Sequence, residues 1–216
     1  TAQTELEDFS VIQITPNHAQ VSVIQAIHLV NLTSAIKVTL TYSIWADGLI
    51  KINANFFLNK QLQVLPRIGL EFVISKEIRQ IKYYGMGPNE NYRDRLSSAS
   101  MGVYESDISE EHFPFVTPCE NGGHENVRWI ELFTKYLNYA KISSAIPFHF
   151  DIHHNTIEDY QTAKHNYELP LRDESYLHID ALHSGIGGDM GWSTFFTEEH
   201  KVLPRNYALE FYIDLY

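Results

Sequence analysis

The stretch Ile36-Lys-Val-Thr-Leu-Thr-Tyr-Ser-Ile-Trp-Ala-Asp-Gly-Leu-Ile-Lys-Ile-Asn-Ala-Asn-Phe-Phe-Leu58 decides the fold of this chain. Apolar and polar residues alternate on both sides of Asp47-Gly48, a dipeptide that favours a tight hairpin turn. A period of two gives each strand one buried and one solvated face, as in an antiparallel sheet. The stretch therefore predicts a β-hairpin with strands over 36–44 and 50–58.

The same alternation returns over residues 148–152 and 209–215, so we expect further strands there. One segment, 156–165, has the signals of a short helix. Thr156 is a favourable N-cap, acidic residues follow in the first turn, and Lys164 and His165 lie in the last. Strands at short spacing, turns rich in Gly, Pro and Asn, and one brief helix indicate an all-β antiparallel sandwich.

Composition limits the class of protein. The 216 residues are 44% hydrophobic, and no repeat or linker divides them, so we expect one β-sandwich domain over residues 1–216. A formal net charge of −11 argues against nucleic acid or an anionic membrane as partner. No apolar run approaches the roughly 20 residues that span a bilayer. Because Cys119 is the only cysteine, no intrachain disulfide is possible, and we expect a cytoplasmic protein.

A glycine-dense loop, His183-Ser-Gly-Ile-Gly-Gly-Asp-Met-Gly-Trp192, delivers a single tryptophan near the end of the chain. The flat indole ring suits stacking on a sugar face, but an ordinary core aromatic beside a tight turn is an alternative. No Lys-Ser/Thr pair follows the glycines, so the loop does not predict phosphate binding. We expect support for the ring from His183, Gly185, Gly187, Gly188 and Asp189.

Two polar loops carry further candidates. In Pro88-Asn-Glu-Asn-Tyr-Arg-Asp-Arg95, Glu90 and Asp94 can pair with arginines and hold backbone turns without any ligand. A glycosidase pair is the alternative, but its carboxylates must lie roughly 5 to 10 Å apart, which sequence does not establish. The second loop is Pro118-Cys-Glu-Asn-Gly-Gly-His124. The candidate structural or interface residues are Asn89, Glu90, Asn91, Tyr92, Asp94, Arg95, Glu120 and Asn121.

Three neighbouring histidines, His149, His153 and His154, raise the question of a metal site. Alternation places His149 and His153 on one face of a strand, and no cysteine pair or acid at zinc-site spacing accompanies them. We therefore expect a solvated strand face and no metal. Cys119 has no nearby base in sequence, so we assign it no chemistry.

Five motifs in order resemble the C-terminal, small-chain domain of large β-galactosidases, which is also the small subunit of two-subunit forms. They are Leu65-Pro-Arg-Ile-Gly-Leu70, Gly85-Met-Gly-Pro-Asn-Glu-Asn-Tyr92, Asp94-Arg95, Pro118-Cys-Glu-Asn-Gly122, and Gly185-Ile-Gly-Gly-Asp189 with Trp192. The resemblance implies a large antiparallel sandwich, or supersandwich, of the galactose-mutarotase-like kind.

The resemblance also implies roles. The aromatic matching Trp192 reaches into an active site formed mainly by a catalytic (β/α)-barrel and stacks on the sugar, whose β-galactosidic bond the barrel hydrolyses with retention. The catalytic glutamates, together with the magnesium and sodium sites, belong to other domains, so we expect no catalytic residue or cofactor in this chain. The implied partners are that barrel or large subunit and a galactoside, and homo-oligomers are an expectation.

Two departures qualify the resemblance. Met190-Gly191 stands where relatives often have an acidic or amide residue and then serine, which bears on the placement of the ring. The chain also resembles a family domain without its N-terminal strands, which would expose pairing edges and favour association. A stand-alone carbohydrate-binding module and a mutarotase-type epimerase, working through a histidine and a glutamate, stay open as alternatives.

Overall fold

The computed structural model describes residues 2–30, 33, 35–187 and 197–216. Their order along the chain is β1 (Ala2–Thr15), β2 (His18–Leu29), β3 (Ile36–Trp45), β4 (Leu49–Phe57), β5 (Arg67–Ile74), β6 (Ile78–Gly87), β7 (Ser100–Asp107), η1 (Ile108–Glu110), β8 (His124–Thr134), β9 (Asn138–His153), α1 (Ile157–Thr162), η2 (Asn166–Glu168), β10 (Ser175–His183), η3 (Glu198–His200) and β11 (Tyr207–Leu215). Among the described residues, no helix has the length and apolar character that a membrane crossing requires.

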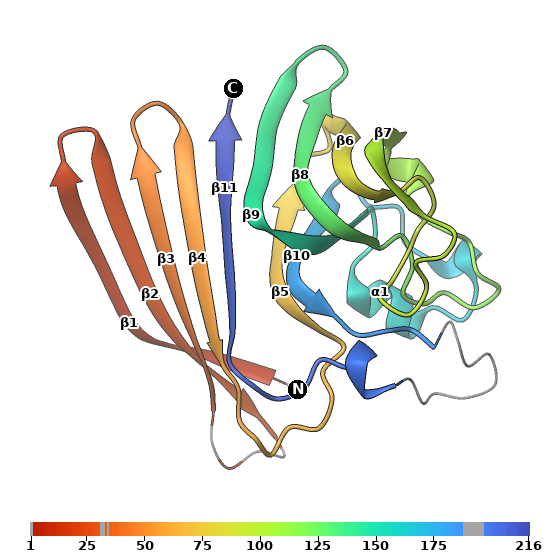
Figure 1. The fold of residues 1–216 in the computed structure, drawn as a ribbon, viewed down its shortest axis with the longest axis horizontal. Helices are drawn as coiled ribbons and strands as arrows, with labels where there is room; N and C mark the ends of the chain where they lie inside the picture. Colours follow the sequence, from red (N-terminus) through yellow and green to blue (C-terminus); the bar gives the residue numbers. More distant parts are fainter. Residues whose placement is uncertain (1, 31–32, 34, 188–196) are drawn as a thin grey trace.

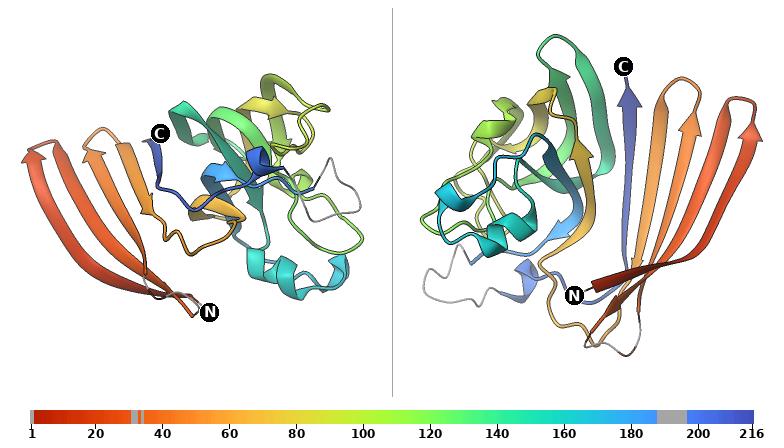
Figure 2. Two further views of the ribbon diagram at one scale, coloured as in Figure 1. Left: turned by 60° about the horizontal axis from the view of Figure 1, so that its bottom comes forward. Right: turned by 180° about the vertical axis from the view of Figure 1, so that it is seen from behind.

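The prediction of an antiparallel all-β fold is confirmed. Within the described chain, eleven strands form one sheet in the order β1-β2-β3-β4-β11-β9-β8-β6-β7, with β10 and β5 branching from β9. Figures 1 and 2 show β1 to β4 and β11 as neighbouring strands that form one curved part of the sheet. The helix α1 and the long loops lie on the other side, near β6 to β10. The predicted hairpin is β3 and β4, which pair from Lys37↔Phe57 to Ile44↔Ile50 around a turn in which Gly48 has a φ of 98°.

The sheet divides at β9, and this division creates a second layer. The first part of β9 pairs with β11, whereas its last part, from His149 to His153, pairs with β10. β10 in turn pairs with β5, and Phe72 of β5 packs edge-on against Phe211 of β11 with ring centroids 6.0 Å apart. Apolar side chains fill the space between the layers, including fully buried Leu177 and Ile179 of β10.

The predicted helix exists but is shorter than expected. α1 begins after Thr156, whose side chain accepts from the backbone N–H of Asp159 while the Asp159 carboxylate accepts from the N–H of Thr156. The helix ends at Thr162, because Ala163 adopts extended backbone angles. Lys164 and His165 therefore lie beyond it, and the expectation that they occupy its last turn is wrong.

Candidate functional site

The polar side chains of the last part of β9 are buried, which corrects the prediction of a solvated strand face. His149, Asp151 and His153 do share one face, but they are 2%, 1% and 5% exposed. The loop after β6 covers one end, where the Tyr92 ring lies 5.5 Å from that of His149, and α1 covers the other, where Tyr160 lies 5.6 Å from His153. The prediction failed because alternation identifies two faces of a strand and not what covers the second.

Arg67, at the start of β5, is the centre of this buried cluster. Its Nε donates to Asp180 Oδ2 at 3.0 Å, and its Nη2 contacts both Asp180 and Asp151. Nη1 lies 3.8 Å from Glu120 Oε2. Burial alone would raise the pKa of the Asp151 carboxyl, yet the Arg67 charge and the hydrogen bond from His178 hold that pKa well below its usual value. The arginine therefore neutralises carboxylates that come from three separate segments.

His178 of β10 links two acidic residues. Its Nδ1 lies 2.7 Å from Asp151 Oδ1 and its Nε2 lies 2.9 Å from Glu71 Oε2. Because an ionised carboxylate only accepts hydrogen bonds, this arrangement favours the doubly protonated ring. Burial lowers the pKa of His178, but the hydrogen bond and the negative charge of Asp151 together outweigh it, so the pKa is raised.

One group in the described part of the chain has the composition of a metal site. Ligand atoms of His149, Asp151 and Asp180 lie within 4.8 Å of one another. The Arg67 guanidinium contacts both carboxylates and supplies a positive charge between them. His154 turns away from this face, and its Nδ1 lies 3.3 Å from the backbone oxygen of Glu174.

Three rings pack together beneath the polar loops. The His149 and His183 rings stack with centroids 4.7 Å apart, and Tyr92 lies 5.3 Å from His183. The Tyr92 hydroxyl donates to Glu120 Oε1 at 3.2 Å, and His149 Nδ1 lies 3.1 Å from Glu125 Oε1. Burial lowers the pKa of His183, but the nearby Glu120 raises it more. Tyr92, Glu120 and His183 therefore contact one another beneath the polar loops.

The loop after β6 is held by its own polar side chains. Glu90 pairs with Arg95, as expected, and its second oxygen accepts from the backbone N–H of Gly122 at 2.7 Å. Asn91 is fully buried and donates to the backbone oxygen of Asn89 at 2.9 Å. These contacts join the two polar loops that the sequence singles out, and Glu90 and Arg95 form the expected pair there.

Asp94 binds the start of the glycine-dense loop. Its carboxylate accepts from the backbone N–H groups of Ile186 at 3.2 Å and Gly187 at 2.7 Å. A Cβ on Gly185 would lie 2.7 Å from the Asp94 carboxylate, so the close approach requires glycine there. Asp94 thus anchors the start of the predicted sugar platform. The rest of that platform lies outside the described residues: Gly188, Asp189 and Trp192.

The second polar loop is closed by Asn121. Its side-chain oxygen accepts from the N–H of Phe113 at 2.9 Å, and its amide donates to the backbone oxygen of Cys119 at 2.8 Å. The backbone oxygen of Asn121 lies 2.9 Å from His153 Nε2. Partial burial raises the pKa of the Cys119 thiol, and Glu90 and Glu120 raise it further. A thiol held protonated is a poor nucleophile, so the structure adds no chemistry at this cysteine.

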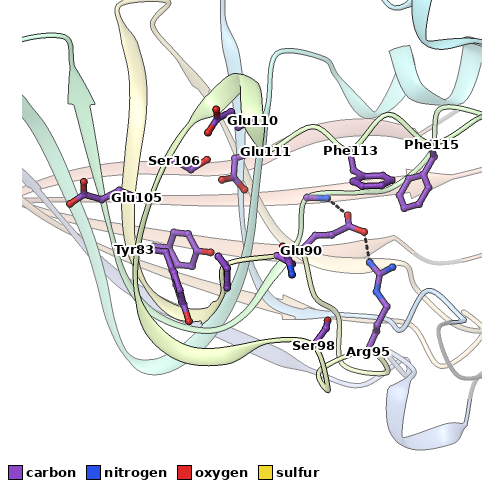
Figure 3. Close-up of a pocket in the computed structure, with 14 residues that line it drawn as sticks. Tyr83, Glu90, Arg95, Ser98, Glu105, Ser106, Glu110, Glu111, Phe113 and Phe115 are labelled. Carbon is purple, nitrogen blue, oxygen red and sulfur yellow. Dashed lines mark hydrogen bonds and ion pairs between the residues drawn. The ribbon is translucent and has the colours of Figure 1, made fainter.

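A cavity of about 520 Å³ opens beside these loops (Figure 3). The loop after β6 forms one wall, β7 and η1 form another, and the segment after η1 forms a rim. Glu90 and Arg95 contribute to it, so the structural loops also shape a hollow. Its lining residues are Tyr83, Pro88, Asn89, Glu90, Arg95, Ser98, Tyr104, Glu105, Ser106, Glu110, Glu111, Phe113, Phe115 and Gly122.

Sequence reasoning missed the centre of the buried cluster. Arg67 lies within one of the quoted motifs, but nothing local assigns it a partner, because the residues that bind it lie 84 and 113 positions away. Asp151 and Asp180 carry a usable signal, since each is an acid within an otherwise apolar and histidine-rich strand. Such acids are rarely buried without a partner, so a search for a matching arginine would have been justified.

Comparison with known proteins gives a consistent result. The profile of the family described as "Beta galactosidase small chain" matches residues 2–213. A β-galactosidase of Vibrio cholerae is 32% identical over 208 residues, which cover 96% of this chain and 19% of that protein. A β-galactosidase of Streptococcus thermophilus is 31% identical over 183 residues, covering 84% and 18%. The chain therefore spans about a fifth of these relatives.

Among solved structures, a putative aldose 1-epimerase of Escherichia coli aligns with 95% of this chain and 67% of its own. The sequence identity is 10% and the TM-score is 0.41.

Proposed function

Because the chain belongs to the β-galactosidase small-chain family, we propose that it is a non-catalytic part of a β-galactosidase that completes the sugar site of a catalytic barrel. The observation that carries the proposal is the family match over residues 2–213, combined with coverage of about a fifth of the relatives' length. The assembled enzyme would hydrolyse terminal β-galactosides such as lactose with retention, in the cytoplasm.

The buried cluster supports a structural role for this chain. Asp151 and Asp180 both contact Arg67, and His178 binds Asp151 as well. Carboxylates engaged in this way hold strands and loops together and are not free to attack a sugar or to protonate a leaving group. The catalytic glutamates, and the magnesium and sodium that we expect the assembled enzyme to use, would then come from the partner.

The edge of the sheet offers a surface for that partner. Within the described chain β1 pairs with β2 alone, and it displays apolar side chains such as Phe9, Val11 and Ile12, which are 57%, 59% and 54% exposed. A long, apolar edge strand with unpaired N–H and C=O groups favours pairing with another chain. We propose that the large chain covers this edge, and homo-oligomers of the assembled enzyme are compatible with it.

We propose that Trp192 stacks on the sugar, as the family resemblance implies, and the anchored start of its loop supports this role. Asp94 binds the backbone of Ile186 and Gly187, six and five residues before Trp192. A stacked aromatic contributes on the order of 1 to 3 kcal/mol, so Trp192→Ala should raise the KM of the assembled enzyme about fivefold or more. Trp192→Phe keeps an aromatic face and should retain much of the affinity. An unchanged KM and kcat in Trp192→Ala would eliminate the platform role.

The first test is hydrolysis of a chromogenic β-galactoside by this chain alone and after mixing with a large chain from the same source. We expect activity only on mixing. Hydrolysis by the isolated chain, or no gain on mixing, would contradict the proposal. Interconversion of sugar anomers by the isolated chain would replace it with a mutarotase-type function.

A further inference from the structure

We propose that the cavity beside β7 is a saccharide site on this chain, which takes one or two neutral sugar units whether or not a catalytic partner is bound. At about 520 Å³ it falls within the range of roughly 300 to 1,000 Å³ that small-molecule sites occupy. The inference goes beyond the proposed function, because it concerns residues that are fully described and does not involve the glycine loop.

Charge is the first argument for a neutral ligand. Four glutamates line the wall. Three of them are paired with basic side chains, and the fourth, Glu110, is exposed to solvent. Glu90 pairs with Arg95 (Figure 3), and Glu105 lies 2.6 Å from Lys82 Nζ. Glu111 Oε2 lies 2.7 Å from Nε2 of buried His124. Pairs of this kind attract neither a free cation nor an anion strongly, but their remaining lone pairs and N–H groups serve hydroxyls.

Unused hydrogen-bonding groups are the second argument. The side chains of Asn89 and Ser98 make no hydrogen bond with other described residues, although both line the cavity. Arg95 Nε is buried and also lacks a partner there. A buried donor without an acceptor costs about 1 to 3 kcal/mol, so a ligand or water oxygen at this point would be favoured. Neighbouring donors and acceptors suit a polyol, because each of its hydroxyl groups both donates and accepts hydrogen bonds.

Aromatic surface is the third argument. Phe113 and Phe115 lie together at one end of the cavity, with ring centroids 4.5 Å apart (Figure 3). Phe113 is 52% exposed, so part of its ring surface is open to a ligand in the cavity. Pyranose rings carry a face of C–H groups that packs on such a surface, while the sugar hydroxyls reach the polar wall.

A neighbouring hollow of about 330 Å³ offers room for a second sugar. It shares Glu105, Ser106 and Glu110 with the cavity, so the two hollows adjoin at these residues. Figure 3 places Glu105 and Glu110 on the side of the cavity away from Phe113. One sugar would therefore stack at the phenyl rings and the next would extend toward β7.

The test is a titration of the whole chain with lactose, followed by ligand-observed NMR. We expect saturable binding in the millimolar range, weakened about tenfold by Phe113→Ala. Val116→Ala is the matched control, since Val116 is 92% exposed in the same segment and does not line the cavity. Asn89→Ala should also weaken binding. Circular dichroism of each variant checks that the fold is retained.

Measuring Trp192→Ala in the same titration shows whether the binding depends on the ring named under Proposed function or on the cavity beside β7. Binding that is lost in Trp192→Ala but retained in Phe113→Ala would overturn the proposal, as would the absence of saturable binding. Galactosamine and galacturonate serve as charged probes, and a clear preference for either would overturn the neutral ligand. None of these results depends on hydrolysis after mixing, so the two proposals fail separately.

Discussion

Replacing Arg67 by methionine should remove a large share of the stability of this protein. The guanidinium is 13% exposed, and the Asp151 and Asp180 side chains that it contacts are each 2% exposed. Breaking a buried ion pair by removing one partner costs about 3 to 5 kcal/mol. Asp151 keeps its bond to His178, whereas Asp180 loses its cation, so we expect a loss of about 4 kcal/mol. For a chain of this size that loss lowers Tm by roughly 10 to 15 °C.

Urea denaturation at pH 7 measures the loss, and a second substitution tests its cause. Arg67→Met combined with Asp180→Asn removes the unpaired carboxylate together with the guanidinium, so at least half of the lost stability should return. A loss below about 1 kcal/mol, or no recovery in the double variant, would refute an ion network that holds β5, β9 and β10 together.

The stability of the single variant Arg67→Met should also depend on pH in a defined direction. In the wild type, Arg67 and His178 hold the pKa of Asp151 well below its usual value, so the stabilisation persists above the unfolded pKa near 4 and disappears as the pH falls through the lowered pKa. Without Arg67 that pKa rises, and protonation relieves the buried charge. The difference in stability between Arg67→Met and wild type should therefore narrow from pH 7 to pH 5.

Three further predictions concern other parts of the fold. Gly69→Ala should destabilise the fold by more than about 2 kcal/mol in urea denaturation, because the new Cβ would lie 2.1 Å from Asp180 Oδ1 and 2.3 Å from the backbone oxygen of Ile179. Gly102→Ala should cost less, because its Cβ would meet only the side chain of Tyr104. Because the pKa of His178 is raised, the protonated ring stabilises the fold fully below the unfolded pKa near 6.5, and this stabilisation is lost as the pH rises through the folded pKa. Wild type should therefore lose more stability than His178→Gln between pH 6 and 9. Parallel stability profiles for the two proteins would contradict this. Thr156→Ala should cost about 1 kcal/mol by removing the N-cap of α1 while Thr156→Ser costs little, and equal thermal shifts for the two would argue against the capping box.

Local patterns were sufficient for the strands and for part of the site. The alternation around Asp47-Gly48 predicts β3 and β4 because a period of two and a turn dipeptide are properties of neighbouring residues. The pairing of Glu90 with Arg95 was predictable for the same reason, since the two lie five positions apart. The N-cap at Thr156 was likewise visible, whereas the end of α1 was not.

The sequence by itself determined the antiparallel β fold and the membership in the β-galactosidase small-chain family. The hydrophobic period, the turn residues and the ordered motifs all depend on residues that are close together in the sequence. Tertiary structure alone decided that β9 serves two layers and that its second face, with His149 and Asp151, is buried. It also decided that Arg67 reaches Asp180 across 113 positions and that Asp94 reaches Ile186 across 92. The physical reason is that burial and ion pairing depend on which segments meet in space, and residue spacing does not record that meeting.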